Sequence, residues 1–118
     1  MQSKLFRITL NSAQPDLLLR FYTVLGFKFS QKAVDKGTQA WLGHLGDLSI
    51  EVFSIKESFS QKTAGVQMSF HVKALEDLIK QFRNLKIEIM IEPLEVQSGL
   101  MAIVIDPDGR SIELTQNL

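Results

Sequence analysis

The 118 residues are enough for one domain with a real hydrophobic core, and 45% hydrophobic against 22% charged residues is an ordinary balance for a globular protein. The 13 basic and 13 acidic residues cancel, so no net charge draws the chain to nucleic acid or to an anionic membrane. Cysteine is absent, which excludes disulfides, thiolate metal sites and a cysteine nucleophile. No stretch resembles a signal peptide or a membrane span, so we expect a cytoplasmic location.

The first half of the chain predicts a strand, a helix and three more strands. Apolar and polar residues alternate over residues 4–11, and Pro15 then opens a helical pattern that Gly26 ends. Three strands with short polar turns between them follow, at residues 27–34, 38–45 and 48–53. Turns this short favour an antiparallel meander.

The same order returns in the second half, after a polar and weakly patterned connection at residues 55–65. We expect a strand at 66–72, a helix at 74–85, strands at 86–91, 100–105 and 111–115, a loop at 93–99 and a turn at 106–109. The sequence therefore predicts one α+β domain over residues 1–118, built from two tandem βαβββ modules at about 4–54 and 66–116. Their sheets are expected to form a cupped mixed sheet with the helices on its outer face.

Four of the expected strands have one apolar face and one polar face. Because successive strand residues point to opposite faces, the apolar set is expected to pack on the helices. The other face then carries Arg7 and Thr9; Ser49, Glu51 and Phe53; Gln67, Ser69 and His71; and Ser111, Glu113 and Thr115. These small, polar or ionisable side chains suit a partly enclosed polar cavity, and a solvated outer sheet face is the alternative.

Three further side chains, Trp41, His71 and His44, are candidates for the site or for other places in the fold. Trp41 alternates with Gln39 and Gly43, which favours the polar face and stacking on a ligand, although a place in the core is the alternative. His71 is either a general base or a histidine that is hydrogen-bonded at a strand end. His44 is expected on the surface. No nucleophile elbow and no glycine-rich phosphate loop occur in the sequence.

Two segments resemble a known family. Residues 7–27, RITLNSAQPDLLLRFYTVLGF, resemble the opening of a vicinal-oxygen-chelate module, and residues 106–114, DPDGRSIEL, resemble its closing signature. This is the group of glyoxalases, bleomycin-resistance proteins and extradiol dioxygenases, and the order of elements between the segments also matches. In its metal-dependent members four side chains bind one divalent ion, and those four positions fall here on Arg7, Glu51, Gln67 and Glu113.

The first of these positions departs from the family pattern. The guanidinium of Arg7 has no lone pair for a metal and stays charged. We expect Arg7 to replace the ion electrostatically, either by pairing with Glu51 and Glu113 or by binding an anionic ligand, so no cofactor is expected. If a divalent metal did bind, Glu51, Gln67 and Glu113 would be its ligands.

Three functions follow from the resemblance together with this departure. The first is a metal-free protein that binds a small molecule through Arg7, Thr9, Trp41, Glu51, Phe53, Gln67, Ser69 and Glu113. The second is a metal-dependent lyase, isomerase or dioxygenase, with Glu113 and His71 as candidate catalytic residues. The third is a non-catalytic structural or regulatory subunit. Whether the protein is an enzyme stays open, and the resemblance implies a homodimer.

Overall fold

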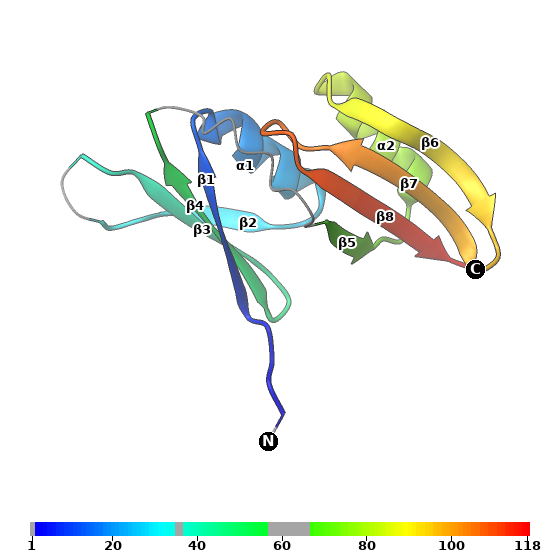
Figure 1. Ribbon diagram of the computed structural model, residues 1–118, viewed down its shortest axis with the longest axis horizontal. Coiled ribbons are helices and arrows are strands. Elements are labelled where there is room, and N and C mark those ends of the chain that lie inside the picture. Colours follow the sequence, from blue (N-terminus) through cyan, green and yellow to red (C-terminus); the bar gives the residue numbers. More distant parts are fainter. Residues whose placement is uncertain (1, 35–36, 57–66) are drawn as a thin grey trace. The chain divides into compact units, whose positions relative to one another are not determined.

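The computed structural model describes residues 2–34, 37–56 and 67–118, and the chain divides into two units, Met1–Ser58 and Phe59–Leu118. The division falls within the predicted connection. The elements of the first unit are β1 (Arg7–Ser12), α1 (Pro15–Val24), β2 (Lys28–Lys32), β3 (Ala40–Leu45) and β4 (Leu48–Ser54). Those of the second are β5 (Met68–His71), α2 (Leu75–Asn84), β6 (Glu88–Val96), β7 (Gly99–Ile105) and β8 (Ser111–Asn117). The α+β class and the repeated βαβββ order are confirmed (Figure 1).

Each unit contains a four-stranded mixed sheet, with strand order β1-β4-β3-β2 in the first and β5-β8-β7-β6 in the second. In both sheets the first strand runs parallel to the last, and the other neighbours are antiparallel. The predicted meander of β2, β3 and β4 is therefore present. The same topology places the strand before the helix beside the final strand of its unit, which brings residues about forty positions apart into register.

The core of the first unit lies between α1 and one face of its sheet. Leu18, Phe21 and Tyr22 of α1 are fully buried, as are the β4 residues Ile50 and Val52. Pro15 occupies the first turn of α1, where a missing N–H breaks no helical hydrogen bond. The aromatic rings of Tyr22, Phe27 and Phe29 then follow one another, with centroids 6.0 and 6.1 Å apart, from the helix onto β2. This row of rings marks the face of the sheet that α1 covers.

The second unit buries its core in the same way. Leu75, Ile79 and Phe82 of α2 pack with the fully buried residues Ala102 and Val104 of β7 and Ile112 and Leu114 of β8. Of these side chains, Ile112 and Leu114 form the apolar set of β8 that the alternation assigned to the helix side. Neither described helix is long and apolar enough to cross a membrane.

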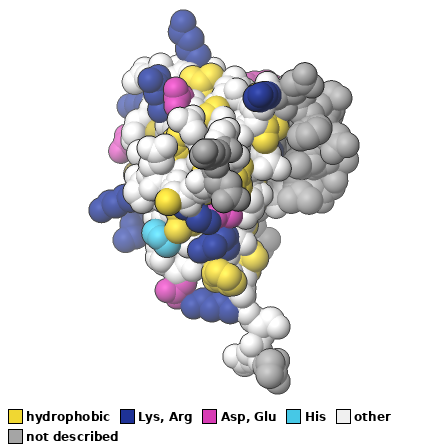
Figure 2. All heavy atoms as spheres, turned by 90° about the vertical axis from the view of Figure 1, so that its left-hand side faces the viewer, with side chains coloured by type: hydrophobic (Ala, Val, Ile, Leu, Met, Phe, Trp, Pro, Cys, Tyr) yellow, Lys and Arg dark blue, Asp and Glu magenta, His cyan; other side chains and the backbone are white. Residues whose placement is uncertain are grey.

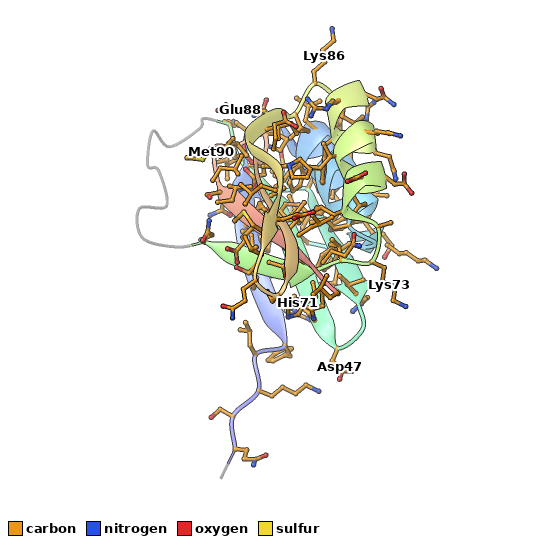
Figure 3. All side chains as sticks on the ribbon, turned by 90° about the vertical axis from the view of Figure 1, so that its right-hand side faces the viewer. Asp47, His71, Lys73, Lys86, Glu88 and Met90 are labelled. Atoms are coloured by element: carbon orange, nitrogen blue, oxygen red, sulfur yellow. The ribbon has the colours of Figure 1, made fainter. Side chains whose placement is uncertain are left out.

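The residue after each helix end has a left-handed backbone. In the first unit this is Gly26, with φ 110°, which needs no side-chain accommodation. In the second unit the corresponding residue is Lys86, with φ 61°. Figure 3 shows its side chain extending away from the ribbon beyond α2. Lys86 therefore has a backbone conformation that glycine adopts at lower cost.

The prediction of a loop at residues 93–99 is wrong. β6 continues through Pro93 to Val96, and only Gln97 and Ser98 separate it from β7. Proline is tolerated because β6 is the edge strand of its sheet, where one side of the strand has no partner strand among the described residues. Register shifts between Ile89 and Ile91 and between Ile91 and Leu94 interrupt the ladder around it. Residues 57–65 of the predicted connection between the two modules lie outside the described residues.

Candidate functional site

The predicted polar residues of β1 and β4 share one face, away from α1. The register sets Arg7 opposite Ser49, Thr9 opposite Glu51 and Asn11 opposite Phe53. The neighbouring strands continue these rows with His44, Leu42 and Ala40 of β3 and with Lys28, Ser30 and Lys32 of β2. We call these twelve residues the polar face of the first sheet. Figure 2 shows Lys and Arg side chains spread over one side of the molecule, with acidic and hydrophobic side chains between them.

Glu51 is the buried carboxylate of this face, with 6% of its surface exposed. The hydroxyl of Thr9 donates a hydrogen bond to Oε1 at 3.1 Å, and the ammonium of Lys32 forms an ion pair with Oε2. The hydrogen bond from Lys32 is the strongest influence and lowers the pKa of Glu51, while burial opposes it and the positive charge of Arg7 adds to it. Glu51 is therefore an ionised carboxylate with protein donors on both oxygens.

The predicted ion pair between Arg7 and Glu51 is wrong, because Lys32 takes that place. Arg7 is one row away, opposite Ser49, and its guanidinium lies 5.5 Å from the centroid of the Phe6 ring. Within residues 2–34, 37–56 and 67–118, Arg7 forms no ion pair. Sequence analysis missed Lys32 because β2 and β4 are not neighbours, and alternation within β2 gives no register across β3.

Phe53 lies on the polar face, as its alternation predicted. It is half-buried, and the ammonium of Lys32 is 5.9 Å from the centroid of its ring. Lys32 therefore contacts the carboxylate of Glu51 and also covers an aromatic surface. The apolar side chain of Leu42 lies beside Glu51 on the same face.

The face predicted for Trp41 is wrong. Trp41 lies opposite Val52, so its side chain is on the helix face of the sheet and not on the polar face. The alternation of β3 misled because the next residue on the helix side is Gly43, whose missing side chain leaves room for Phe29. β3 therefore presents glycine to the core and leucine to the polar face, the reverse of the usual pattern.

The polar residues predicted for β5 and β8 also share one face, and they are joined in pairs. Gln67 Nε2 donates to Ser111 Oγ at 2.9 Å, Ser69 Oγ donates to Glu113 Oε1 at 2.9 Å, and Thr115 Oγ1 lies 2.8 Å from His71 Nδ1. His71 is exposed at the end of β5, so the hydrogen-bonded strand-end interpretation describes its geometry. A role for His71 as a general base stays a prediction.

One hydrogen bond is repeated in both units. Thr9 donates to Glu51 in the first, and Ser69 donates to Glu113 in the second, each between the parallel strands of its sheet. The third partner differs, because the place that Lys32 occupies on β2 corresponds to Leu94 on β6. The repeat that the sequence showed only as a pattern of elements therefore includes one shared pair of side chains.

The residues of the first unit do not fit the divalent ion that the resemblance implies. Arg7 has no lone pair to offer, and both oxygens of Glu51 already accept from Lys32 and Thr9. In the second unit Gln67 donates through Nε2 to Ser111, and Glu113 accepts through Oε1 from Ser69. Among the described residues no three His, Asp or Glu side chains are grouped so that they could hold a metal ion. The ammonium group of Lys32 already balances the charge of the Glu51 carboxylate.

Comparison with solved structures finds close similarity over the full chain. A glyoxylase/bleomycin resistance protein/dioxygenase domain from Frankia sp. EAN1pec is 21% identical, with a TM-score of 0.78 and complete coverage of both chains. The trypanothione-dependent glyoxalase I of Leishmania major is 22% identical, with a TM-score of 0.76 over 98% of this chain and 87% of that one. The fosfomycin resistance protein FosX of Mesorhizobium loti is 12% identical, with a TM-score of 0.76 over 100% and 95%.

The sequence comparisons add nothing to these structural ones. No protein-family model matches the sequence, and no curated protein matches it significantly. At identities this low, similarity of structure establishes the fold and does not establish the activity. The resemblance read from the opening and closing segments is thus confirmed at the level of fold: the chain has the fold of the glyoxalase, bleomycin-resistance and dioxygenase proteins of the vicinal-oxygen-chelate group.

Proposed function

We propose that this protein binds a small organic molecule on the polar face of the first sheet without a metal ion. The observation that carries the proposal is the state of Glu51. Its carboxylate is buried and already neutralised by Lys32, with Thr9 on its other oxygen. A site built around an ion pair of this kind recognises its ligand by hydrogen bonds and apolar contact instead of by coordination.

The polar face offers both kinds of contact to such a ligand. Arg7 is exposed and supplies donors, while the half-buried side chains of Leu42 and Phe53 supply apolar surface. The hydroxyl of Thr9 is also exposed, and it offers a ligand an acceptor because its proton is donated to Glu51. Trp41 is not part of this proposal, because it lies on the helix face. Gln67, Ser69 and Glu113 form a separate polar face on the second unit, and their contact with a ligand stays a prediction.

The solved structures support a small molecule as the class of ligand. The names of two of them, a fosfomycin resistance protein and a trypanothione-dependent glyoxalase I, each refer to a small molecule. Those names describe the other proteins, and only the fold is shared with this chain. A cytoplasmic location and a homodimer belong to the same proposal.

The test combines a chelator with a binding screen. Protein treated with EDTA is titrated with a library of small aromatic and aliphatic fragments, and ¹H–¹⁵N correlation spectra record the backbone amides. The expected result is that some fragments shift the amides of Thr9, Glu51 and Phe53 in EDTA. The proposal is overturned if no fragment shifts them, which favours the structural subunit, or if the shifts require added Mg²⁺, Mn²⁺ or Ni²⁺, which favours the metal-dependent enzyme.

A further inference from the structure

Four side chains form a continuous row across the polar face of the first sheet. Arg7 of β1 lies opposite Ser49 of β4, Ser49 opposite His44 of β3, and His44 opposite Lys28 of β2. Neighbouring strands are about 4.8 Å apart, so the row spans about 14 Å between its outer Cα atoms. Basic groups therefore occupy both ends of the row, and a hydroxyl and an imidazole lie between them.

We infer that this row binds the oxyanion of a small molecule, a carboxylate or a phosphate group. The inference rests on the proposed function, since it names the chemical class of ligand for the same face. Its first support is the charge balance. Two carboxylates of the first unit already have ammonium partners, Lys32 for Glu51 and Lys4 for Asp47. In the described part of the chain Arg7 and Lys28 form no ion pair, and both side chains are exposed.

The middle of the row supplies a neutral donor in either tautomer of the imidazole. Ser49 Oγ lies 2.9 Å from His44 Nδ1. If the hydroxyl donates to Nδ1, then Nε2 of the neutral ring carries a proton and can donate. If Nδ1 donates to the hydroxyl oxygen, then the Ser49 proton is available. Each arrangement leaves one donor between the two cations, which suits an anion with several acceptor oxygens.

The second unit contains the corresponding row without the basic residues. The places of Ser49, His44 and Lys28 correspond there to Ser111, Ile105 and Glu88, which are paired in the same register. Gln67 takes the place of Arg7 and donates to Ser111 at 2.9 Å. Figure 3 labels Glu88 at the start of β6. Only serine is common to both rows, so the basic charge belongs to the first row and is not a consequence of the fold.

The experiment titrates inorganic phosphate and sodium acetate, separately, into protein at constant ionic strength set with sodium chloride, which keeps general screening the same throughout. The amides of Arg7, His44 and Ser49 report binding in ¹H–¹⁵N spectra. The test variant carries both Arg7→Gln and Lys28→Gln. The control is Lys80→Gln, which removes one positive charge per site in the same way on the exposed side of α2. All are exposed positions, and urea unfolding confirms that each variant is folded.

The expected result is saturable shifts of the row amides with at least one of the two anions, weakened about tenfold or more in the double variant because each charge-assisted hydrogen bond contributes strongly. A protein with Arg7→Lys and Lys28→Gln should bind the anion more tightly than the double glutamine variant, because it keeps a positive charge at position 7. Lys80→Gln should leave the affinity for the anion unchanged. The inference is overturned if neither anion shifts the row, if the double variant binds like wild type, or if Lys80→Gln weakens binding equally.

These outcomes separate the inference from the proposed function. Fragments that shift Thr9, Glu51 and Phe53 while both anions leave the row unmoved would sustain metal-free binding and reject the oxyanion. A second arm uses vesicles of phosphatidylglycerol, whose headgroup phosphate offers the same chemistry on a surface. Cosedimentation of the protein with these vesicles would reject a small molecule as the source of the anion, and its absence together with phosphate binding would support it.

Discussion

Gly43 of β3 lies directly opposite Phe29 of β2, and the ring of Phe29 occupies the space that a Cβ atom on residue 43 would need. Such an atom would lie 2.6 Å from two ring carbons. Gly43→Ala is therefore expected to destabilise the protein by about 1–3 kcal/mol, measured by urea unfolding, because the ring must leave its place in the aromatic row.

The control for this prediction is a smaller side chain at position 29. Phe29→Leu alone should also destabilise, but the double variant should cost less than the sum of the two single changes, because leucine relieves the overlap. An additive double variant would mean that the ring moves away freely, and the explanation for the reversed alternation of β3 would then be lost.

The second prediction concerns Lys86 and its left-handed backbone. Lys86→Gly should raise the free energy of unfolding by up to about 1 kcal/mol, because glycine adopts this φ without the steric cost that a Cβ atom imposes. Lys86→Ala removes the same side chain and keeps the cost, so it should give no gain. The reciprocal change in the first unit, Gly26→Ala, should destabilise. Equal gains from glycine and alanine would show that backbone strain is not the cause.

The third prediction is a dependence of stability on pH that Glu51 produces. The pKa of Glu51 is lowered from its ordinary value of 4.5, chiefly by Lys32. A carboxylate with a lowered pKa in the folded state contributes stability above its ordinary pKa and loses it as the pH falls through the folded-state pKa. The difference in unfolding free energy between wild type and Glu51→Gln should therefore be greatest near neutral pH and shrink below 4.5. A difference that stays constant down to acid pH would contradict the lowered pKa.

Removing the partner of Glu51 gives a related fourth prediction. Lys32→Met leaves a buried carboxylate without its ion pair, which should cost about 1–3 kcal/mol at neutral pH. We expect the lower part of this range because the Lys32 side chain is 37% exposed and water screens part of the interaction. Lys28→Met, on the same strand and face but without an ion pair among the described residues, is the control and should change stability little. Equal effects of the two variants would exclude a special role for Lys32.

The fifth prediction compares the hydrogen bond that both units share. Thr9→Val should cost more stability than Ser69→Ala, about 1 kcal/mol against a smaller amount. The reason is that Glu51 is buried whereas Glu113 is only half-buried, so water can replace the lost donor more easily at Glu113. Urea unfolding of the two variants measures both effects. A larger loss for Ser69→Ala would show that Glu113 depends on its hydroxyl partner more than its exposure suggests.

Alternation along single strands predicted the fold and most of the polar faces correctly. It succeeded for β1, β4, β5 and β8 because each of these strands has large apolar side chains on one side and polar ones on the other. In β4, for example, Ile50 lies on the apolar side and Glu51 on the polar side. It failed for Trp41 because a glycine on the core side carries no signal in its own strand and takes its meaning from Phe29 of the neighbouring strand. Pairing across strands is a property of the whole sheet.

The lack of information about pairing across strands also explains which parts of the site could not be predicted. The positions of Glu51 and Thr9 followed from alternation, and the family resemblance drew attention to Glu51 and Arg7. The ion pair with Lys32 did not follow, because it joins strands that have β3 between them. The row from Arg7 to Lys28 was invisible for the same reason, since its four members come from four strands and only the register of the complete sheet brings them into line.

The irregular edge strand β6 has a consequence for how the protein behaves at high concentration. A straight edge strand of nine residues with exposed Met90, Leu94 and Val96 would be a template for strands of other molecules. Pro93 offers no N–H to an incoming strand, and the register shifts on either side of Ile91 bend the edge away from a regular ladder. The second sheet therefore has an edge strand with exposed apolar side chains, and Pro93, which strand prediction treats as a break, opposes its pairing with strands of other molecules.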